Sequence, residues 1–301
     1  MVLLPVMDHK AFLKSLPTDT QTRLTQRSDA AGIKHLLGHV ALILVCGGWI
    51  AFGLPLWWVV VPIQGIAIVF LFTLEHEATH KTPFANEALN EWVGRACGLL
   101  LVLPFEWFRY FHFAHHRYTN IPGKDPELAA GQKHYEGWGP FLWHVTGLPF
   151  WVSMARQVWV NATGRVEADY LPERVRPRLK TEARWMVLIY LLALLSLFAS
   201  SLLFWVWILP VLVGQPFLRL YLLAEHGRCP QVANMFDNSR TTYTTAIVRF
   251  LAWNMPYHTE HHVYPAVPFF RLADLHEEMQ SHLLHEQEGY VNFTKETIVR
   301  L

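Results

Sequence analysis

The chain has 301 residues, of which 52% are hydrophobic and only 16% are charged, and its formal net charge is +1. Soluble domains carry about 25% charged residues, so this composition argues against a purely soluble protein and indicates membrane contact. A net charge near zero, with no separate basic run, gives no reason to expect a nucleic-acid partner. The three isolated cysteines exclude a disulfide framework and a cysteine-based metal site.

Two charge-free blocks predict the membrane elements. Residues 36–74 and 185–218 contain no Asp, Glu, Lys or Arg, and each block is too long for one bilayer crossing of roughly 20 residues. Turns near Gly53-Leu54-Pro55 and Ser200-Ser201 divide them. We therefore expect an all-α membrane protein with four transmembrane helices in two hairpins, 36–75 and 185–224. The four spans are expected near 36–53, 55–75, 185–201 and 203–224, with no signal peptide before them.

The basic residues predict the orientation of these spans. Neither hairpin turn contains any of the 25 Lys and Arg residues, which are frequent before the first span, between the hairpins and after the last span. The positive-inside rule then places both termini and the middle segment in the cytoplasm. We expect a single integral-membrane domain, 1–301, whose cytoplasmic, histidine-rich helical cap comprises 76–184 and 225–301.

Two further apolar segments are broken by Pro or Gly. Residues 98–108 and 139–160 are rich in aromatic side chains, and we expect both to be interfacial helices. The alternative for 139–160 is a tilted fifth span, which would move the C-terminal histidines to the opposite side of the membrane.

Histidines form three clusters along the chain. Eight of the 17 histidines lie in "HEATH" (His76, His80), "HFAHH" (His112, His115, His116) and "HTEHH" (His258, His261, His262). By chance, an H-x-x-H-H pattern is expected roughly 0.05 times in such a chain. Residues i, i+3 and i+4 share one face of a helix, so we expect each triplet to aim its imidazoles at one point.

The predicted topology brings these clusters to one membrane surface. All three lie at or beyond the cytoplasmic ends of the spans, and His226, just past the last span, lies at the same level. Nine imidazoles exceed the capacity of one catalytic metal, which takes about three protein ligands, but suit two metals with four or five nitrogens each. Imidazole ligation is compatible with Zn, Cu, Fe or Ni. Two such metals facing buried hydrocarbon favour oxidative chemistry over hydrolysis, and no Ser-His-Asp arrangement or P-loop competes.

The three histidine boxes, separated by two hairpins, resemble the integral-membrane fatty acid desaturase and hydroxylase superfamily. "FEWFRYFHFAHHRYTN" with "DPE" at 125–127, and "RTTYTTAIVRFLAWNMPYHTEHHVYPAVPF", are similar to bacterial desaturase-like members. The resemblance implies a bacterial inner-membrane protein with a non-haem site of two Fe ions and with O₂ as co-substrate. It implies the removal of two hydrogens from a fatty acyl or other lipid-like chain, with electrons from an external ferredoxin, rubredoxin or cytochrome and its reductase. The implied metal ligands are His76, His80, His112, His115, His116, His226, His258, His261 and His262.

The resemblance also suggests residues around the ligands. In acyl-CoA members an Asn one turn before the lone histidine orients a metal-bound water, but Leu222 occupies that position here, and Asn254, one turn before His258, is the candidate for this role. Ligating histidines commonly donate their other N–H to a carboxylate. The candidate acceptors are Glu77, Glu225 and Asp125, together with Glu75 and Glu127.

Other functions stay open at this point. The H-x-x-x-H spacing of the first box also occurs in hydroxylases and ketolases, so a di-iron hydroxylase or ketolase of a lipid, alkane or carotenoid is the nearest alternative. A desaturase of a small amphiphilic, amino-acid-derived metabolite is another. A histidine-rich metal transporter or sensor belongs to a different class, but transporters place their ligands near mid-membrane, where the predicted spans contain only His39.

Overall fold

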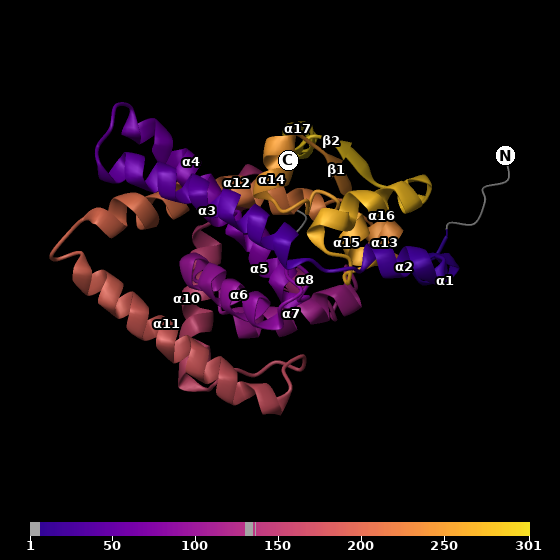
Figure 1. Ribbon diagram of the computed structural model, residues 1–301, viewed down its shortest axis with the longest axis horizontal. Helices are drawn as coiled ribbons and strands as arrows, with labels where there is room; N and C mark the ends of the chain where they lie inside the picture. Colours follow the sequence, from indigo (N-terminus) through magenta and orange to yellow (C-terminus); the bar gives the residue numbers. More distant parts are fainter. Residues whose placement is uncertain (1–6, 130–134, 136) are drawn as a thin grey trace.

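The computed structural model describes residues 7–129, 135 and 137–301, and this part of the chain is almost entirely helical (Figure 1). The α-helices are α1 (His9–Ser15), α2 (Thr18–Leu24), α3 (Asp29–Ala51), α4 (Trp57–Val69), α5 (Leu71–Thr79), α6 (Glu87–Leu101), α7 (Phe105–Tyr118), α8 (Pro126–Ala129), α9 (Trp138–Val145), α10 (Leu148–Thr163), α11 (Arg176–Ser196), α12 (Leu209–His226), α13 (Met235–Asn238), α14 (Ala246–Leu251), α15 (His258–Val263), α16 (Leu272–Met279) and α17 (Tyr290–Ile298). The short elements are the 3-10 helices η1 (Glu173–Val175), η3 (Phe269–Arg271) and η4 (Gln280–His282), the π-helical segment η2 (Phe204–Ile208), and the parallel strands β1 (Thr241–Tyr243) and β2 (Glu286–Glu288).

Three helical runs of the described chain are long and apolar enough to cross a membrane. They are Thr18–Ala51, Trp57–Thr79 and Phe204–His226, and they overlap the first, second and fourth predicted spans. The remaining predicted span, 185–201, overlaps the apolar second half of α11, whose first half is charged. The chain is therefore a mainly helical membrane protein, while the four-span topology and the cytoplasmic cap stay predictions.

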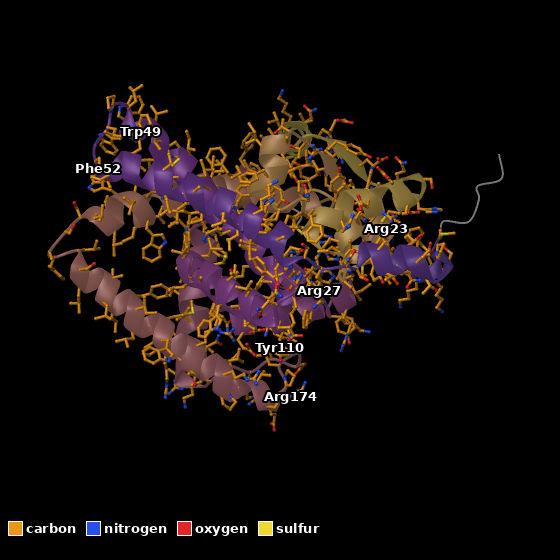
Figure 2. The ribbon with its side chains drawn as sticks, in the orientation of Figure 1. Arg23, Arg27, Trp49, Phe52, Tyr110 and Arg174 are labelled. Carbon is orange, nitrogen blue, oxygen red and sulfur yellow. The ribbon has the colours of Figure 1, made fainter. Side chains whose placement is uncertain are left out.

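The first hairpin turns where the sequence predicts it. Gly53 adopts a left-handed conformation with φ 59° in the turn between α3 and α4, a conformation that glycine adopts at low cost. Figure 2 shows Trp49 and Phe52 at this end of the hairpin, far from Arg23 and Arg27 near the start of α3. The apolar residues at the hairpin turn and the arginines at its other end are separated as the positive-inside rule requires for the predicted orientation.

Many apolar side chains on the long helices are exposed. Leu44 of α3, Trp58 of α4, Leu192 of α11 and Phe217 of α12 have relative exposures of 68%, 63%, 57% and 48%. Exposed apolar surface of this extent marks a contact with lipid or another apolar partner.

Helices α4 and α12 cross with their backbones in direct contact. A Cβ added to Gly65 would lie 2.1 Å from the carbonyl oxygen of Pro210, and one added to Gly214 would lie 2.4 Å from the backbone of Gly65. Small residues at a helix crossing permit this approach in membrane proteins. The crossing fixes the position of α12, whose last residue is His226.

The segment 139–160 forms two helices instead of one span. Helices α9 and α10 have 8 and 16 residues and are separated at Gly147, which has φ 72°. Similarly, 98–108 divides between α6 and α7, with Val102 in the left-handed region. A single tilted fifth span over 139–160 is therefore wrong, because the glycine breaks the helix.

His39 has hydrogen-bond partners at both of its ring nitrogens. Its Nε2 lies 2.7 Å from the carbonyl oxygen of Ala67 on α4, and its Nδ1 accepts a hydrogen bond of 3.1 Å from Trp253 Nε1. Trp253 comes shortly before the third histidine box. His39 thus connects α3 and α4 to the segment that carries that box, which is a structural role.

Candidate metal centre

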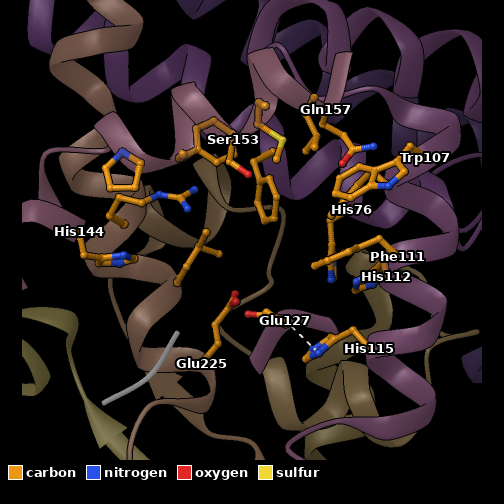
Figure 3. Close-up of a pocket in the computed structure, with 18 of the residues that line it drawn as sticks. His76, Trp107, Phe111, His112, His115, Glu127, His144, Ser153, Gln157 and Glu225 are labelled. Atoms are coloured by element: carbon orange, nitrogen blue, oxygen red, sulfur yellow. Dashed lines mark ion pairs between the residues drawn. The ribbon is translucent and has the colours of Figure 1, made fainter. Parts of the chain in front are cut away.

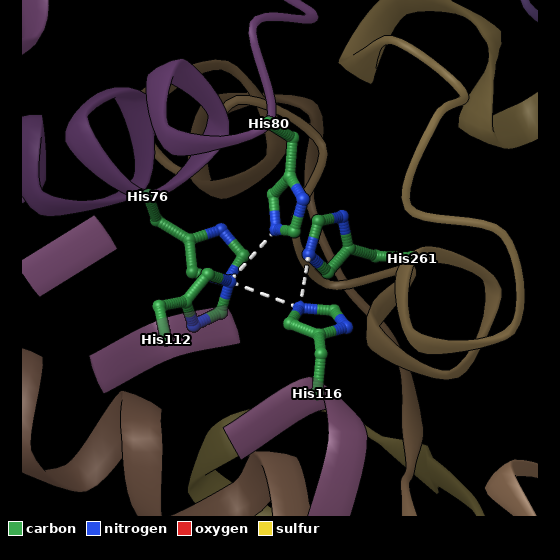
Figure 4. Close-up of side chains that lie close together, drawn as sticks. All are labelled: His76, His80, His112, His116 and His261. Carbon is green, nitrogen blue, oxygen red and sulfur yellow. Dashed lines mark hydrogen bonds between the residues drawn. The ribbon is translucent and has the colours of Figure 1, made fainter. Parts of the chain in front are cut away.

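The nine predicted histidines come together from four elements. His76 lies on the last full turn of α5 and His80 is its C-terminal cap, while α7 carries the second box, α15 the third box, and α12 ends at His226. All four helix segments point into one region, and Figure 4 shows five of the imidazoles facing one another there. The convergence expected from the topology is present in the structure.

The imidazoles form two groups, which we call cluster one and cluster two. In cluster one, ring nitrogens of five histidines lie within 4.8 Å of one another, and the same holds for His115, His226 and His262 in cluster two. His258 joins cluster two, because its Nε2 lies 2.8 Å from Nε2 of His226. Cluster one comprises His76, His80, His112, His116 and His261, and cluster two comprises His115, His226, His258 and His262.

The prediction that each triplet aims at one point is wrong. On α7, His112 and His116 belong to cluster one and His115 to cluster two, whereas on α15 His258 and His262 belong to cluster two and His261 to cluster one. The cause is helix geometry: at 3.6 residues per turn, residues i+3 and i+4 lie about 100° apart on either side of residue i. Each triplet therefore contributes to both clusters, with i and i+4 together and i+3 apart.

The nitrogen contacts in cluster one do not form an ordinary hydrogen-bond network. Nε2 of His112 lies 2.8 Å from Nε2 of His80 and 2.9 Å from Nε2 of His116, and the latter lies 3.1 Å from Nε2 of His261. Each nitrogen of a neutral imidazole is either a hydrogen-bond donor or an acceptor, and a donor has only one proton. Nε2 of His112 therefore cannot make ordinary hydrogen bonds to Nε2 of His80 and of His116 while Nε2 of His116 also bonds to Nε2 of His261. A cation among the lone pairs would turn this crowding into coordination.

The tautomers in cluster two give stronger evidence that its imidazoles are arranged to bind a metal ion. His115 Nδ1 donates to Asp125 Oδ1 at 3.0 Å, and His226 Nδ1 donates to the carbonyl oxygen of Asn238 at 3.0 Å. When Nδ1 carries the one proton of each ring, the two Nε2 atoms present lone pairs to each other at 3.2 Å. Two facing lone pairs repel, so the arrangement fits a metal ion bound by both nitrogens.

Burial favours the neutral form of five of these imidazoles. It lowers the pKa of His80 from 6.5 to about 3. Burial and neighbouring imidazoles also lower the pKa of His112, His116, His261 and His262 well below the usual range. Neutral imidazole is the form that coordinates metals, so these side chains are available as ligands near pH 7.

Four of the five candidate carboxylates lie next to imidazole nitrogens. Asp125 contacts His115 as above, Glu77 Oε1 lies 3.4 Å from His261 Nδ1, and Glu225 Oε1 lies 3.4 Å from His258 Nδ1. Glu127 Oε2 adds a second carboxylate at 3.0 Å from His115 Nδ1 (Figure 3). Glu75 differs, because its carboxylate is directed toward Gly98 of α6.

The side chain of Asn254 binds a backbone carbonyl and not a site beside the histidines, where it was expected. Its side-chain amide donates to the carbonyl oxygen of Phe269 at 3.0 Å, and its backbone adopts φ 56°. An amide one helical turn before a histidine would lie on the same face of the helix, but residue 254 belongs to the turn that precedes α15 and not to a helix.

Three residues that contact or belong to the histidine boxes were not predicted from the sequence. Asn238 supplies the carbonyl for His226, and Thr119 Oγ1 lies 3.3 Å from His262 Nδ1. Glu260 is buried inside the third box, where it accepts from Thr241 Oγ1 at 2.7 Å and lies 2.6 Å from His276 Nδ1. A carboxylate at the third position of "HTEHH" was the available signal for Glu260, whereas a backbone carbonyl leaves no sequence signal.

A cavity of about 480 Å³ opens onto both clusters. His76 and His112 of cluster one and His115 and His258 of cluster two line it. Aromatic and aliphatic side chains from α5, α7 and α10 form most of the remaining wall, including Phe72, Trp107, Phe108, Phe111, Phe150 and Met154. Figure 3 shows the histidines on one side of the cavity and His144 of α9 on the other. An apolar substrate can thus lie beside the histidine nitrogens.

Comparison with known proteins agrees with this arrangement. The chain matches the fatty acid desaturase family over residues 55–294. It is 27% identical over 250 residues to a sphingolipid delta(4)-desaturase/C4-monooxygenase of Mus musculus, covering 80% of this chain and 72% of the relative. It is 23% identical over 265 residues to an sn-1 oleoyl-lipid 12-desaturase of Arthrospira platensis, covering 77% and 72%. An omega-6 chloroplastic fatty acid desaturase of Arabidopsis thaliana is 23% identical over 259 residues, covering 74% and 54%. The chain therefore belongs to the fatty acid desaturase family and is an oxidoreductase.

Proposed function

We propose that the protein is an O₂-dependent di-iron desaturase that introduces a C=C double bond into a fatty acyl or other lipid-like chain. The observation that carries this proposal is the position of two adjacent all-histidine clusters at the wall of an apolar cavity. Family membership and the desaturase names of the relatives support the same reaction class.

Cluster one would hold one iron through His76, His80, His112, His116 and His261. Cluster two would hold the other through His115, His226, His258 and His262. When bound, the two irons supply the redox chemistry with O₂ that breaks two unactivated C–H bonds. In the balanced reaction the substrate loses two hydrogens, an external donor supplies two electrons with two protons from water, and O₂ becomes two waters.

Residues around the clusters hold the imidazoles in the tautomer and orientation that metal binding requires. Asp125 and the Asn238 carbonyl hold protons on Nδ1 of His115 and His226, which directs the Nε2 lone pairs inward. Outer partners of this kind orient ligands and raise their basicity. The aromatic wall of the cavity excludes water from the alkyl chain and restricts which C–H pair lies beside the clusters.

Membrane topology forms part of the proposal. We place the apolar half of α11 as the fourth span and the histidine clusters on the cytoplasmic face of a bacterial inner membrane, with both termini cytoplasmic. Exposed apolar side chains on this half of α11, such as Leu192 and Leu195, support this placement. A soluble ferredoxin, rubredoxin or cytochrome could then deliver electrons to that face.

Monooxygenation is the second candidate, and one observation favours it. The mouse relative is named both a desaturase and a C4-monooxygenase, and both outcomes start from breaking a C–H bond. A hydroxylated product would gain one oxygen, whereas a desaturated product loses two hydrogens.

Mass spectrometry of lipids and metabolites separates these outcomes. Cells expressing the protein are compared with cells expressing His261→Ala, with protein levels matched by immunoblot. The proposal predicts a product two hydrogens lighter than its precursor that is absent with the variant. A product one oxygen heavier would replace desaturation by hydroxylation, and an unchanged lipid and metabolite profile would contradict both.

A further inference from the structure

Arg219 is a buried cation that the site described so far does not use. It lies on α12, has a relative exposure of 5%, and lines the cavity beside the histidine clusters. It is also the residue that ends the charge-free block 185–218. An ionisable side chain within a membrane helix is costly and usually serves a site, and a buried charge needs a partner to offset its desolvation.

The guanidinium presents two donors without acceptors. Arg219 Nε and Nη2 are both buried and make no hydrogen bond within the described part of the chain. The group stacks on the ring of Phe150, 4.5 Å from its centroid, a contact that leaves the N–H groups in the guanidinium plane free. Nε and Nη2 lie on one edge of that plane, and their parallel N–H bonds match the two oxygens of one carboxylate.

Tyr135 supplies another unused donor in the same cavity. Its hydroxyl is buried and has no hydrogen-bond partner among the described residues, and the side chain lines the cavity together with Arg219. Burial raises the pKa of Tyr135 to about 12 although the nearby Arg219 charge opposes this rise. The hydroxyl therefore stays protonated near neutral pH and can donate.

The carboxylates of the cavity are positioned at the histidines. Glu127 Oε2 lies 3.0 Å from His115 Nδ1 and Glu225 Oε1 lies 3.4 Å from His258 Nδ1. His144, across the cavity from His115 (Figure 3), lines the cavity together with Arg219, and burial and the Arg219 charge lower the pKa of His144 to about 4. The charges of Glu127 and Glu225 also act on Arg219, but its Nε and Nη2 atoms make no hydrogen bond among the described residues.

We propose that the cavity binds its substrate through a terminal carboxylate that pairs with Nε and Nη2 of Arg219 and accepts a hydrogen bond from Tyr135. The alkyl part then lies along the aromatic wall beside the histidines. This inference rests on the proposed function and names its substrate class: an amphiphilic free acid instead of a thioester or a glycerolipid ester. Because a helix rises about 1.5 Å per residue, Arg219 lies roughly 10 Å along α12 from His226. The oxidised position is therefore counted from the carboxyl end.

Equilibrium binding tests this inference without any need for iron or electrons. The full chain in lipid nanodiscs is titrated with tritiated dodecanoate, methyl dodecanoate and dodecanol, with empty nanodiscs as the background. Dodecanoate is expected to bind on the order of 10- to 100-fold more tightly than the ester or alcohol, as for charge-assisted hydrogen bonds. Arg219→Met should abolish this preference for the acid. Arg219→Lys should retain only part of it, because lysine keeps the positive charge but lacks the two parallel N–H bonds of the guanidinium.

Two further variants keep the test decisive. Arg156→Met removes an exposed arginine on α10 and should leave the preference for the acid unchanged. Tyr135→Phe removes one hydroxyl with little risk to folding and should weaken dodecanoate binding roughly 2- to 10-fold, with ester binding unchanged. Equal affinity of the wild-type protein for acid and ester, or an acid preference that survives in Arg219→Met, would overturn the inference.

Product analysis separates this inference from the proposed reaction. With acids of increasing chain length, the double bond should stay at one distance from the carboxyl carbon. A double bond formed only in esterified lipids, without acid preference in binding, would support the desaturase and refute the carboxylate site. Arg219-dependent acid binding with no oxidised product would support the carboxylate site and refute the desaturase.

Discussion

Asp125→Asn is predicted to weaken metal binding at cluster two while leaving cluster one filled. Asp125 is buried, and its two oxygens accept from three donors: Oδ1 from His115 Nδ1 at 3.0 Å and from the Glu127 backbone N–H at 2.9 Å, and Oδ2 from the Asn120 backbone N–H at 2.8 Å. An amide in the same place must direct its NH₂ group at one of these donors in either orientation.

The cost of this substitution takes one of two forms. A buried donor left without an acceptor costs about 1–3 kcal/mol of folding stability. Alternatively, His115 moves its proton to Nε2, the nitrogen that faces His226 at 3.2 Å, and ceases to be a ligand. Loss of an outer-shell partner typically costs 10- to 100-fold in metal affinity, and we expect a loss in that range here.

The assay is iron per purified chain by inductively coupled plasma mass spectrometry along a chelator titration. Wild-type protein is expected to retain near two irons, and Asp125→Asn to lose one of them at a 10- to 100-fold lower chelator concentration. Asp274→Asn, a partly exposed carboxylate that pairs with Arg271, serves as the control and should match wild type. Equal chelator resistance of Asp125→Asn and wild type would refute the reasoning about the His115 tautomer.

Three other perturbations have distinct expected results. Gly65→Ala places a Cβ 2.1 Å from the Pro210 carbonyl oxygen, so thermal denaturation in detergent should show destabilisation by about 1–3 kcal/mol. Gly48→Ala, where a Cβ meets nothing within 4 Å, should change little, and equal melting of both variants would contradict the helix contact. His39→Leu should destabilise the fold by about 1–3 kcal/mol yet keep its iron, and iron loss at unchanged melting temperature would instead make His39 a ligand. The pKa of His80 is about 3 in the folded protein against an ordinary 6.5, so the unfolded chain binds more protons between these values. Metal-free protein should therefore lose stability as the pH falls below about 6.5, and a melting temperature constant from pH 7 to 5 would contradict this.

The sequence allowed the grouping of the histidines to be predicted because it depends on coarse properties. Spacing in the boxes and charge-free blocks between them were enough to place His76, His112 and His258 at one surface. Which cluster each imidazole joins depends on rotation about the helix axis, and the separation of His115 from His112 was missed for that reason.

Contacts that involve the backbone, or that join segments distant in the chain, could not be predicted from the sequence. The Asn238 carbonyl that holds His226 could belong to any residue type. Asn254 has the right spacing but lies in a turn, where spacing along the chain no longer sets direction. Arg219 was visible as a charge within the predicted span 203–224, but only the structure shows that its Nε and Nη2 have no hydrogen-bond partner among the described residues.

The most direct test of the central claim is anomalous X-ray scattering from crystals of the protein as isolated, recorded on both sides of the iron absorption edge. Two iron peaks are expected, one within cluster one and one within cluster two. A single peak, or peaks that appear at the zinc edge and not at the iron edge, would contradict the account of a two-iron oxidative centre.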